Sequence, residues 1–440
     1  MPTADSLIIR QATLNPEDPF ANDELDRSTL AKRLSKYVDR LADGAVLGID
    51  APWGEGKSWF GRRWAVQLAV DHKVGYIDAF ESDYVDDPFV LIVAELSKLV
   101  ECGQTSPMRR KAGEVAKALA PATLKAVVNF AGRTALGVVD LTEKVEEAID
   151  KATETAASAA EKWFDKRIQA VESERSSIAG FKSELQKIAE NQSKPIVVFI
   201  DELDRCRPSF AVTLIERVKH LFSVPNLVFV LLLNRDQLAQ AVAGVYGSGI
   251  DGHAYLGKFV NIWFDLPRLH ARGDSSNWGG SYVAGVLRQY SLPKERERET
   301  AAFAGELQFW TKHMRLSLRD VERACALHAI ADAKSLPFLT YLIALKIKHA
   351  DRFARLRHRD VATNRECAKW LREQAGNEPA NAWPGSYLHS LAQLHEVEAG
   401  LLNVDQADIL KQHYRDTLGN LSPDRALPWA FDLIDLPLGK

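Results

Sequence analysis

Residues 50–58, Asp-Ala-Pro-Trp-Gly-Glu-Gly-Lys-Ser, constrain the fold more than any other segment of this chain. An apolar run at 45–49 precedes them and predicts a buried strand, and a helical pattern begins at Trp59. A glycine loop between a strand and a helix is typical of phosphate binding, because its N–H groups and the helix N-terminus point at one place. Lys57 would neutralise the β- and γ-phosphates, and the Ser58 hydroxyl would ligate Mg²⁺. The predicted nucleotide-binding residues are Trp53, Gly54, Glu55, Gly56, Lys57, Ser58 and Trp59.

A second apolar run, residues 195–200, ends in an acidic motif. Its β-branched residues predict a central parallel strand that is buried on both faces. A carboxylate at the carboxyl end of such a strand faces the crevice where ligands of open α/β sheets bind. Asp201 is therefore predicted to hold Mg²⁺ through water, and Glu202 to orient and deprotonate the attacking water. Two acids that cap the next helix are the alternative, which the lysine loop makes less favourable.

A third apolar run, residues 227–233, ends at Asn234. A polar side chain at the tip of a strand beside the acidic one can hydrogen-bond the γ-phosphate or the attacking water. Asn234 is predicted to act as this sensor, provided that its strand lies next to the acidic strand. The alternative is that Asn234 only forms a turn, as asparagine often does at strand ends.

Two arginines are candidates for a charge that reports the nucleotide state. Arg319 lies on a predicted helix after the core, and its guanidinium could fork onto γ-phosphate oxygens. The alternative for Arg319 is a salt bridge with its neighbours Asp320 or Glu322. Arg205, directly after the acidic motif, is the competing candidate, which would act on the nucleotide of a neighbouring subunit.

These motifs together resemble the KAP family of P-loop NTPases. In residues 78–80 the chain has Asp-Ala-Phe where the family usually has Asn-Ala-Trp, and Glu202 stands where many members carry an aspartate. The segments that carry the resemblance are residues 23–27, 52–58, 76–81, 200–206, 255–259, 264–267 and 317–323.

The resemblance implies an α/β P-loop NTPase fold, with a mainly parallel sheet flanked by helices, and an ATPase that uses Mg²⁺. Residues 1–270 would form this core, with a helical insertion at about 105–190 between the two nucleotide motifs. Clustered turn residues place the boundary near 270, so that 271–370 form a helical lid, and 371–440 an extension of unassigned role. Beyond the boundary, residues 301–333 and 336–356 are predicted as two helices.

Soluble bacterial members of the family resemble components of antiphage defence systems. The resemblance therefore implies a motor or sensor subunit of a multi-protein complex. The alternatives are a nucleotide-gated scaffold with little turnover and a signalling ATPase at a membrane surface. Because no Asn-Lys-x-Asp motif for guanine is present, ATP is favoured over GTP.

Composition is in keeping with a cytoplasmic protein. The net charge of −3, with both signs interspersed, gives no global argument for nucleic-acid binding. The four cysteines are scattered without a C-x-x-C pair, which favours a reducing compartment over a disulfide framework or a zinc site. Residues 1–5 show no signal-peptide pattern.

Three further segments bear on membranes and partners. Many family members carry transmembrane helices in the insertion, but here its most apolar part, 118–139, contains Lys125 and Arg133. Central charges cost roughly 2.5–3.5 kcal/mol each in a spanning helix, so a soluble helix is expected. Residues 142–175 show a heptad-like seam, interpreted as a solvent-facing helix or as a partner or homo-oligomer contact. The basic cluster at 346–359 favours a solvated helix face over nucleic-acid binding, because it interleaves a single aromatic residue.

Overall fold

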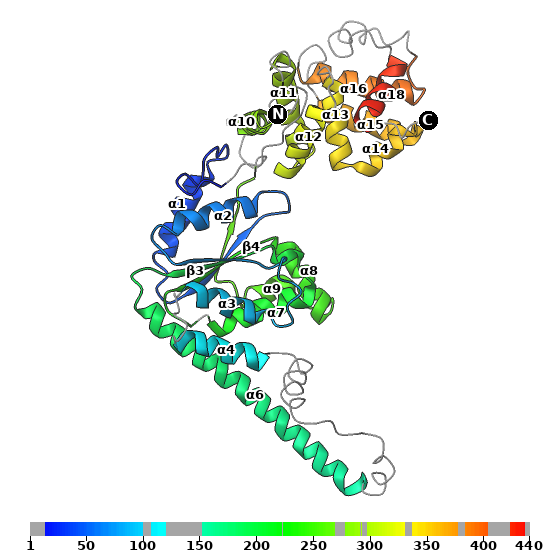
Figure 1. The fold of residues 1–440 in the computed structure, drawn as a ribbon. Helices are drawn as coiled ribbons and strands as arrows, with labels where there is room; N and C mark the ends of the chain where they lie inside the picture. The colour runs from blue at the N-terminus through cyan, green and yellow to red at the C-terminus, as the bar shows by residue number, and fades with distance from the viewer. Residues whose placement is uncertain are drawn as a thin grey trace, which may run out of the picture.

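The structure is a computed structural model. It describes residues 14–99, 107–119, 152–221, 223–268, 278–290, 292, 297–330, 337–376, 383–403 and 423–435. Across these ranges an α/β part extends to strand β5, and a helical part follows from helix α10 onward (Figure 1).

The α/β part is built on a five-stranded sheet with the strand order β2-β3-β4-β1-β5. Every neighbouring pair of strands in this sheet runs parallel. The three central strands are almost completely buried, which explains why their sequences are continuous apolar runs rather than alternating ones. The strands are β1 (Ala45–Asp50), β2 (Val74–Asp78), β3 (Ile196–Asp201), β4 (Leu227–Leu233) and β5 (Ile262–Asp265).

Helices cover both faces of the sheet (Figure 1). One face packs on α1 (Arg27–Val38) and α2 (Lys57–Leu68), in a core centred on Phe60 and Trp64. The other face packs on the remaining helices of the α/β part. Those helices are α3 (Phe89–Leu99), α4 (Pro107–Leu119), α6 (Ala152–Glu190), α7 (Pro208–Val218), α8 (Arg235–Tyr246) and α9 (Gly252–Leu256), and two 3₁₀ turns, η1 (Leu203–Arg205) and η2 (Lys219–Leu221), lie among them.

The predicted insertion between the nucleotide motifs is helical where it is described. Its helices α4 and α6 pack against each other, and α6, which has 39 residues, extends well beyond the α/β body (Figure 1). Residues 120–151, which hold most of the apolar segment and the start of the heptad-like seam, lie outside the described residues. Within the described ranges, no helix is long and apolar enough to cross a membrane.

The strands and helices described in the C-terminal part are all helices, with a separate core around Trp310, Phe338 and Tyr341. Both segments predicted as long helices are helical where they are described, but each is divided in two. The first breaks near Arg315, whose φ is 51°, and the second breaks at His349. The helices are α10 (Trp278–Arg288), α11 (Glu297–His313), α12 (Leu318–Ile330), α13 (Pro337–Lys348), α14 (Ala350–Arg357), α15 (Val361–Ala375), α16 (Gly385–Glu398) and α18 (Pro423–Asp435).

Candidate functional site

The glycine loop leaves β1 at Asp50 and enters α2 at Lys57. Gly54 and Gly56 have φ angles of 85° and 74°, in the left-handed region that favours glycine. A side chain at either position would also displace a neighbouring side chain. A Cβ atom on Gly54 would lie 2.6 Å from Ser317 Oγ, and one on Gly56 would lie 2.6 Å from Arg27 Nη1. The loop conformation therefore requires both glycines.

Lys57 is buried and folds back over this loop. Its Nζ donates hydrogen bonds to the carbonyls of Ala51 (2.8 Å) and Pro52 (3.3 Å) and lies 4.0 Å from Asp204 Oδ2. The indole N–H of Trp53 donates to the same carboxylate oxygen of Asp204. Burial lowers the pKa of Lys57, and the nearby charge of Asp204 opposes this shift. The loop thus holds a desolvated cation, which an incoming phosphate would neutralise.

Ser58 and Asp201 lie close to each other at the cavity beside the loop, as a magnesium site requires. Asp201 is fully buried, and its carboxylate accepts hydrogen bonds from the Tyr76 hydroxyl (2.7 Å) and the Glu202 N–H (2.8 Å). Burial raises the pKa of Asp201, and hydrogen bonds from the Tyr76 hydroxyl and the Glu202 N–H oppose this shift. A hydroxyl beside a buried carboxylate is a donor set that suits Mg²⁺, which keeps several waters and binds few protein oxygens. The residues present therefore fit the predicted metal.

Glu202, the predicted general base, has both carboxylate oxygens engaged. The Ser58 hydroxyl donates to Oε1 (3.3 Å), and Arg205 Nη1 donates to Oε2 (2.9 Å). Burial raises the pKa of Glu202, which makes the carboxylate a stronger base, and Arg205 opposes this shift. Arg205 therefore lies inside the site of its own chain and forms an ion pair with the candidate base.

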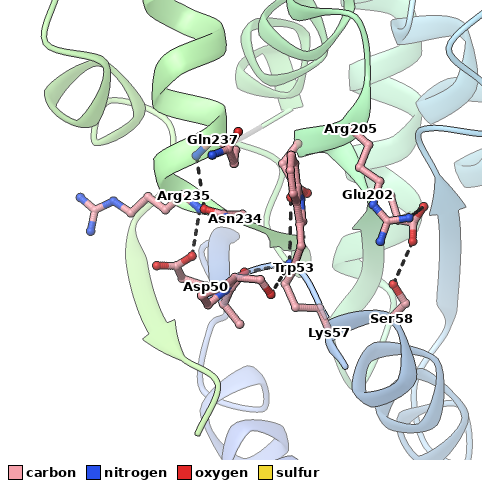
Figure 2. Close-up of polar contacts among 12 residues, drawn as sticks. Asp50, Trp53, Lys57, Ser58, Glu202, Arg205, Asn234, Arg235 and Gln237 are labelled. Atoms are coloured by element: carbon pink, nitrogen blue, oxygen red, sulfur yellow. Dashed lines mark hydrogen bonds and ion pairs between the residues drawn. The ribbon is translucent and has the colours of Figure 1, made fainter. Parts of the chain in front are cut away.

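Strand β4 lies between β3 and β1, which is the strand order that a sensor role for Asn234 requires. The side chain of Asn234, however, caps helix α8, with Oδ1 accepting from the Gln237 N–H at 3.3 Å. In the view of Figure 2, Trp53 stands between this cap and the pair formed by Glu202 and Ser58. Asn234 thus follows a strand next to the acidic strand, as the sensor role requires, but its side chain caps a helix. Its sensor role stays a prediction.

A cavity of about 750 Å³ opens from the loop and the acidic motif toward the N-terminal segment and the helices α10 and α12. Sequence patterns did not predict the side of this cavity that the N-terminal segment, α10 and α12 form. There Arg288 pairs with Glu24 (2.6 Å), and the Tyr282 hydroxyl donates to Glu322 (2.9 Å). Glu24 and Glu322 lie in segments that carry the family resemblance, but no sequence pattern gave these four residues a role, because tertiary packing alone brings their segments together.

Arg319 reaches the same cavity from α12. Ser317 and Asp320 form a reciprocal capping box at the start of this helix, with N···O distances of 3.0 and 3.2 Å. The Arg319 N–H donates to the Gly54 carbonyl (3.1 Å), so the helix start is docked on the glycine loop. Asp320, a partner considered for Arg319, is therefore occupied by the cap, and the exposed Arg319 side chain lines the cavity.

Arg27 is a further residue of the site to which the sequence assigned no role. It is 3 % exposed and donates to two carbonyls of the glycine loop, those of Glu55 (2.7 Å) and Gly56 (3.1 Å). Its place in the Asp-Glu-Leu-Asp-Arg motif at 23–27 is the signal that marked it.

Comparisons with known proteins add one decisive match. The family model described as the KAP family P-loop domain matches residues 27–307, which is more than half of the chain. A search of curated proteins finds no match. Among solved structures, the Aeropyrum pernix ORC2 protein, determined as ADPNP-ADP complexes, is similar over 93% of each chain, with 13% sequence identity and a TM-score of 0.36.

Proposed function

We infer the function of this chain from one premise: it belongs to the KAP family of P-loop proteins, whose domain model matches residues 27–307. We propose that it binds ATP with Mg²⁺ and hydrolyses ATP to ADP and phosphate. The observation that carries the proposal is the meeting of two sequence-distant motifs. Ser58, which follows the glycine loop, donates to Glu202, which follows β3, at the mouth of one cavity.

Each residue has a distinct part in this reaction. Lys57 neutralises the β- and γ-phosphates, and the loop amides bind their oxygens. Ser58 and Asp201 hold Mg²⁺, which when bound offsets the negative charge of the phosphates. Glu202 orients the attacking water and accepts its proton, and its raised pKa favours this transfer. Hydrolysis of this kind depends mainly on positioning and on charge stabilisation.

The proposal is tested by phosphate release from the purified full chain. We expect release with ATP and Mg²⁺, less release with GTP, and none when EDTA removes the metal. Nucleotide affinity should be measured beside turnover, with a fluorescent ATP analogue. Absence of both binding and turnover for every nucleotide would overturn the assignment.

A nucleotide-gated scaffold is the second candidate function, and one observation favours it. Each oxygen of Glu202 already accepts one hydrogen bond, from Ser58 or from Arg205, and these bonds compete with an attacking water for the base. A scaffold would bind ATP with the same residues and release little phosphate, even with partners present. Turnover that rises when partner proteins are added would instead indicate an ATPase whose base is freed on assembly.

We propose further that this ATPase is the motor or sensor subunit of a cytoplasmic multi-protein antiphage defence complex. The resemblance to soluble bacterial members supports this setting, and the projecting helix α6 offers a surface for other subunits (Figure 1). Co-expression with the products of neighbouring genes should yield a stable complex. Phage plating should then show protection by the wild-type complex and its loss in Lys57→Ala. Flotation with lipid vesicles tests the alternative of a signalling ATPase at a membrane surface.

A further inference from the structure

Arg27 occupies a place that is unfavourable for a cation. It is the first residue of α1, where the helix macrodipole presents its positive end. It is also 3 % exposed, and taking a charge out of water costs free energy unless partners compensate. Its contacts must therefore offset both costs.

The contacts of Arg27 converge on the glycine loop. Nη2 donates to the Glu55 carbonyl at 2.7 Å, and Nη1 donates to the Gly56 carbonyl at 3.1 Å. One planar guanidinium thus spans two consecutive carbonyls, a geometry that lysine cannot reproduce. The buried Glu55 side chain interacts electrostatically with Arg27, and this interaction opposes the rise that burial causes in the pKa of Glu55. Gly56 lacks the Cβ atom that would collide with Nη1.

Fixing these carbonyls also fixes the amides that bind phosphate. In a trans peptide the C=O of one residue and the N–H of the next point in opposite directions. The Glu55 carbonyl therefore sets the direction of the Gly56 N–H, and the Gly56 carbonyl sets that of the Lys57 N–H. Loop amides of this kind are the donors that a phosphate-binding loop offers to its ligand.

We propose that Arg27 is a positioning residue that holds the amides of Gly56 and Lys57 in their phosphate-binding orientation. It contributes to nucleotide affinity through the loop backbone and takes no part in proton transfer. The inference rests on the proposed function, since it names the residue that shapes the same phosphate site. It also links α1, and the segment that precedes it, to the affinity for nucleotide.

The test compares Arg27→Ala and Arg27→Lys with Arg33→Ala, a matched control that removes an exposed arginine from the same helix. We expect Arg27→Ala to raise the dissociation constant for ATP and KM about tenfold or more, the effect of losing a charged hydrogen bond. The value of kcat should change less. Arg27→Lys keeps a charge beside Glu55, so it should retain the melting temperature but not the affinity. Arg33→Ala should match the wild type.

Chemical rescue separates positioning from general stability. Guanidinium chloride at millimolar concentrations, far below those that denature proteins, should restore part of the ATP affinity of Arg27→Ala, and sodium chloride should not. Wild-type affinity in the folded Arg27→Ala protein, or full affinity in Arg27→Lys, would overturn the inference and leave the ATPase intact. Lack of nucleotide binding by the wild type would overturn the proposed function, and this inference with it.

Discussion

The α/β part and the helical part both bury polar side chains, but they satisfy them in different ways. In the α/β part four buried charged residues, Arg27, Lys57, Arg63 and Asp201, line one cavity, where phosphate and metal would bind. Burial lowers the pKa of Lys57 and raises the pKa of Asp201, so each loses some of its preference for the charged form. A Mg²⁺-nucleotide would restore that preference by pairing with both.

The helical part pairs its buried polar groups with one another. His395 lies 2.8 Å from the Asn364 side-chain oxygen and 3.1 Å from the Tyr341 hydroxyl, and Thr340 donates to Glu306 at 2.6 Å. Burial lowers the pKa of His395 to about 3 and raises the pKa of Glu306 to about 7, so both resist charging. Internal pairs of this kind rigidify a core and need no ligand.

This contrast indicates which substitutions affect binding and which affect folding. Changes around the cavity should alter nucleotide chemistry and leave the melting temperature nearly unchanged. Changes in the buried pairs of the helical part should alter stability or its pH dependence. A variant that violates this division would show that the two parts are not separable in function.

Lys57→Ala gives the largest expected effect. It removes the phosphate's charge partner, so ATP affinity should fall by about 100-fold or more, at 1.4 kcal/mol per tenfold change, and turnover should reach background. The melting temperature without nucleotide should hold, because a desolvated cation is removed, but ATP should no longer raise it. Isothermal calorimetry and phosphate release check this, with the exposed Lys32→Ala as the control. Wild-type turnover in Lys57→Ala would rule out the assignment.

Glu202→Gln keeps the shape of the side chain and removes the base. Turnover should fall by about 100-fold, within the range that a general base contributes, and ATP affinity should stay within about threefold of the wild type. Any ATP-dependent assembly should then persist, because the nucleotide is not consumed. Glu81→Gln, an exposed glutamate beyond β2, is the matched control. Equal losses of binding and turnover would assign Glu202 to the metal or phosphate site instead.

Sequence patterns predicted the sheet and the two nucleotide motifs because both depend on local rules. The runs at 45–49, 195–200 and 227–233 are apolar because their strands are buried on both faces, and the parallel α/β fold they predicted is confirmed. The capping box of Ser317 and Asp320 is also a local pattern, but its docking on Gly54 is a tertiary contact.

Other features depend on packing that no local pattern encodes. The predicted helix at 301–333 is interrupted near Arg315, where neither glycine nor proline signals a break. Asn234 could cap a helix or face the ligand, and the start of α8 decides which contact its side chain makes. Tyr282 and Arg288 reach the cavity only because α10 packs beside the N-terminal segment.

Glu306 provides a test for the helical part, where substitution of a buried polar group should change the pH dependence of stability. Burial raises its pKa from 4.5 to about 7. Below pH 4.5 the folded and unfolded states both carry the proton, and between pH 4.5 and 7 only the folded state keeps it. Stability should therefore fall by about 3 kcal/mol across this window as pH rises, at about 1.4 kcal/mol per pH unit, and level off above it.

The glutamine variant isolates this contribution. Urea unfolding of the helical part should show the pH dependence in wild type, and Glu306→Gln should remove it, because glutamine stays neutral. The exposed Glu366→Gln in the same part should retain the wild-type slope. A slope that is unchanged in Glu306→Gln would assign the titration to another group. Wild-type ATP affinity in this variant would support the separation of the two parts.

Arg319→Ala gives the smallest expected effect and tests a place where the helical part meets the glycine loop. The Arg319 N–H binds the Gly54 carbonyl, and this backbone contact survives the substitution. Only the exposed guanidinium is removed, and solvent screens its charge, so turnover should fall by about tenfold and ATP affinity by less than about threefold. Arg323→Ala, which removes an exposed arginine one turn further along α12, should leave both values unchanged.

Unchanged turnover in Arg319→Ala, with a slightly lower melting temperature, would make Arg319 a structural residue. The backbone contact with Gly54 would then remain as a link between the helical part and the glycine loop.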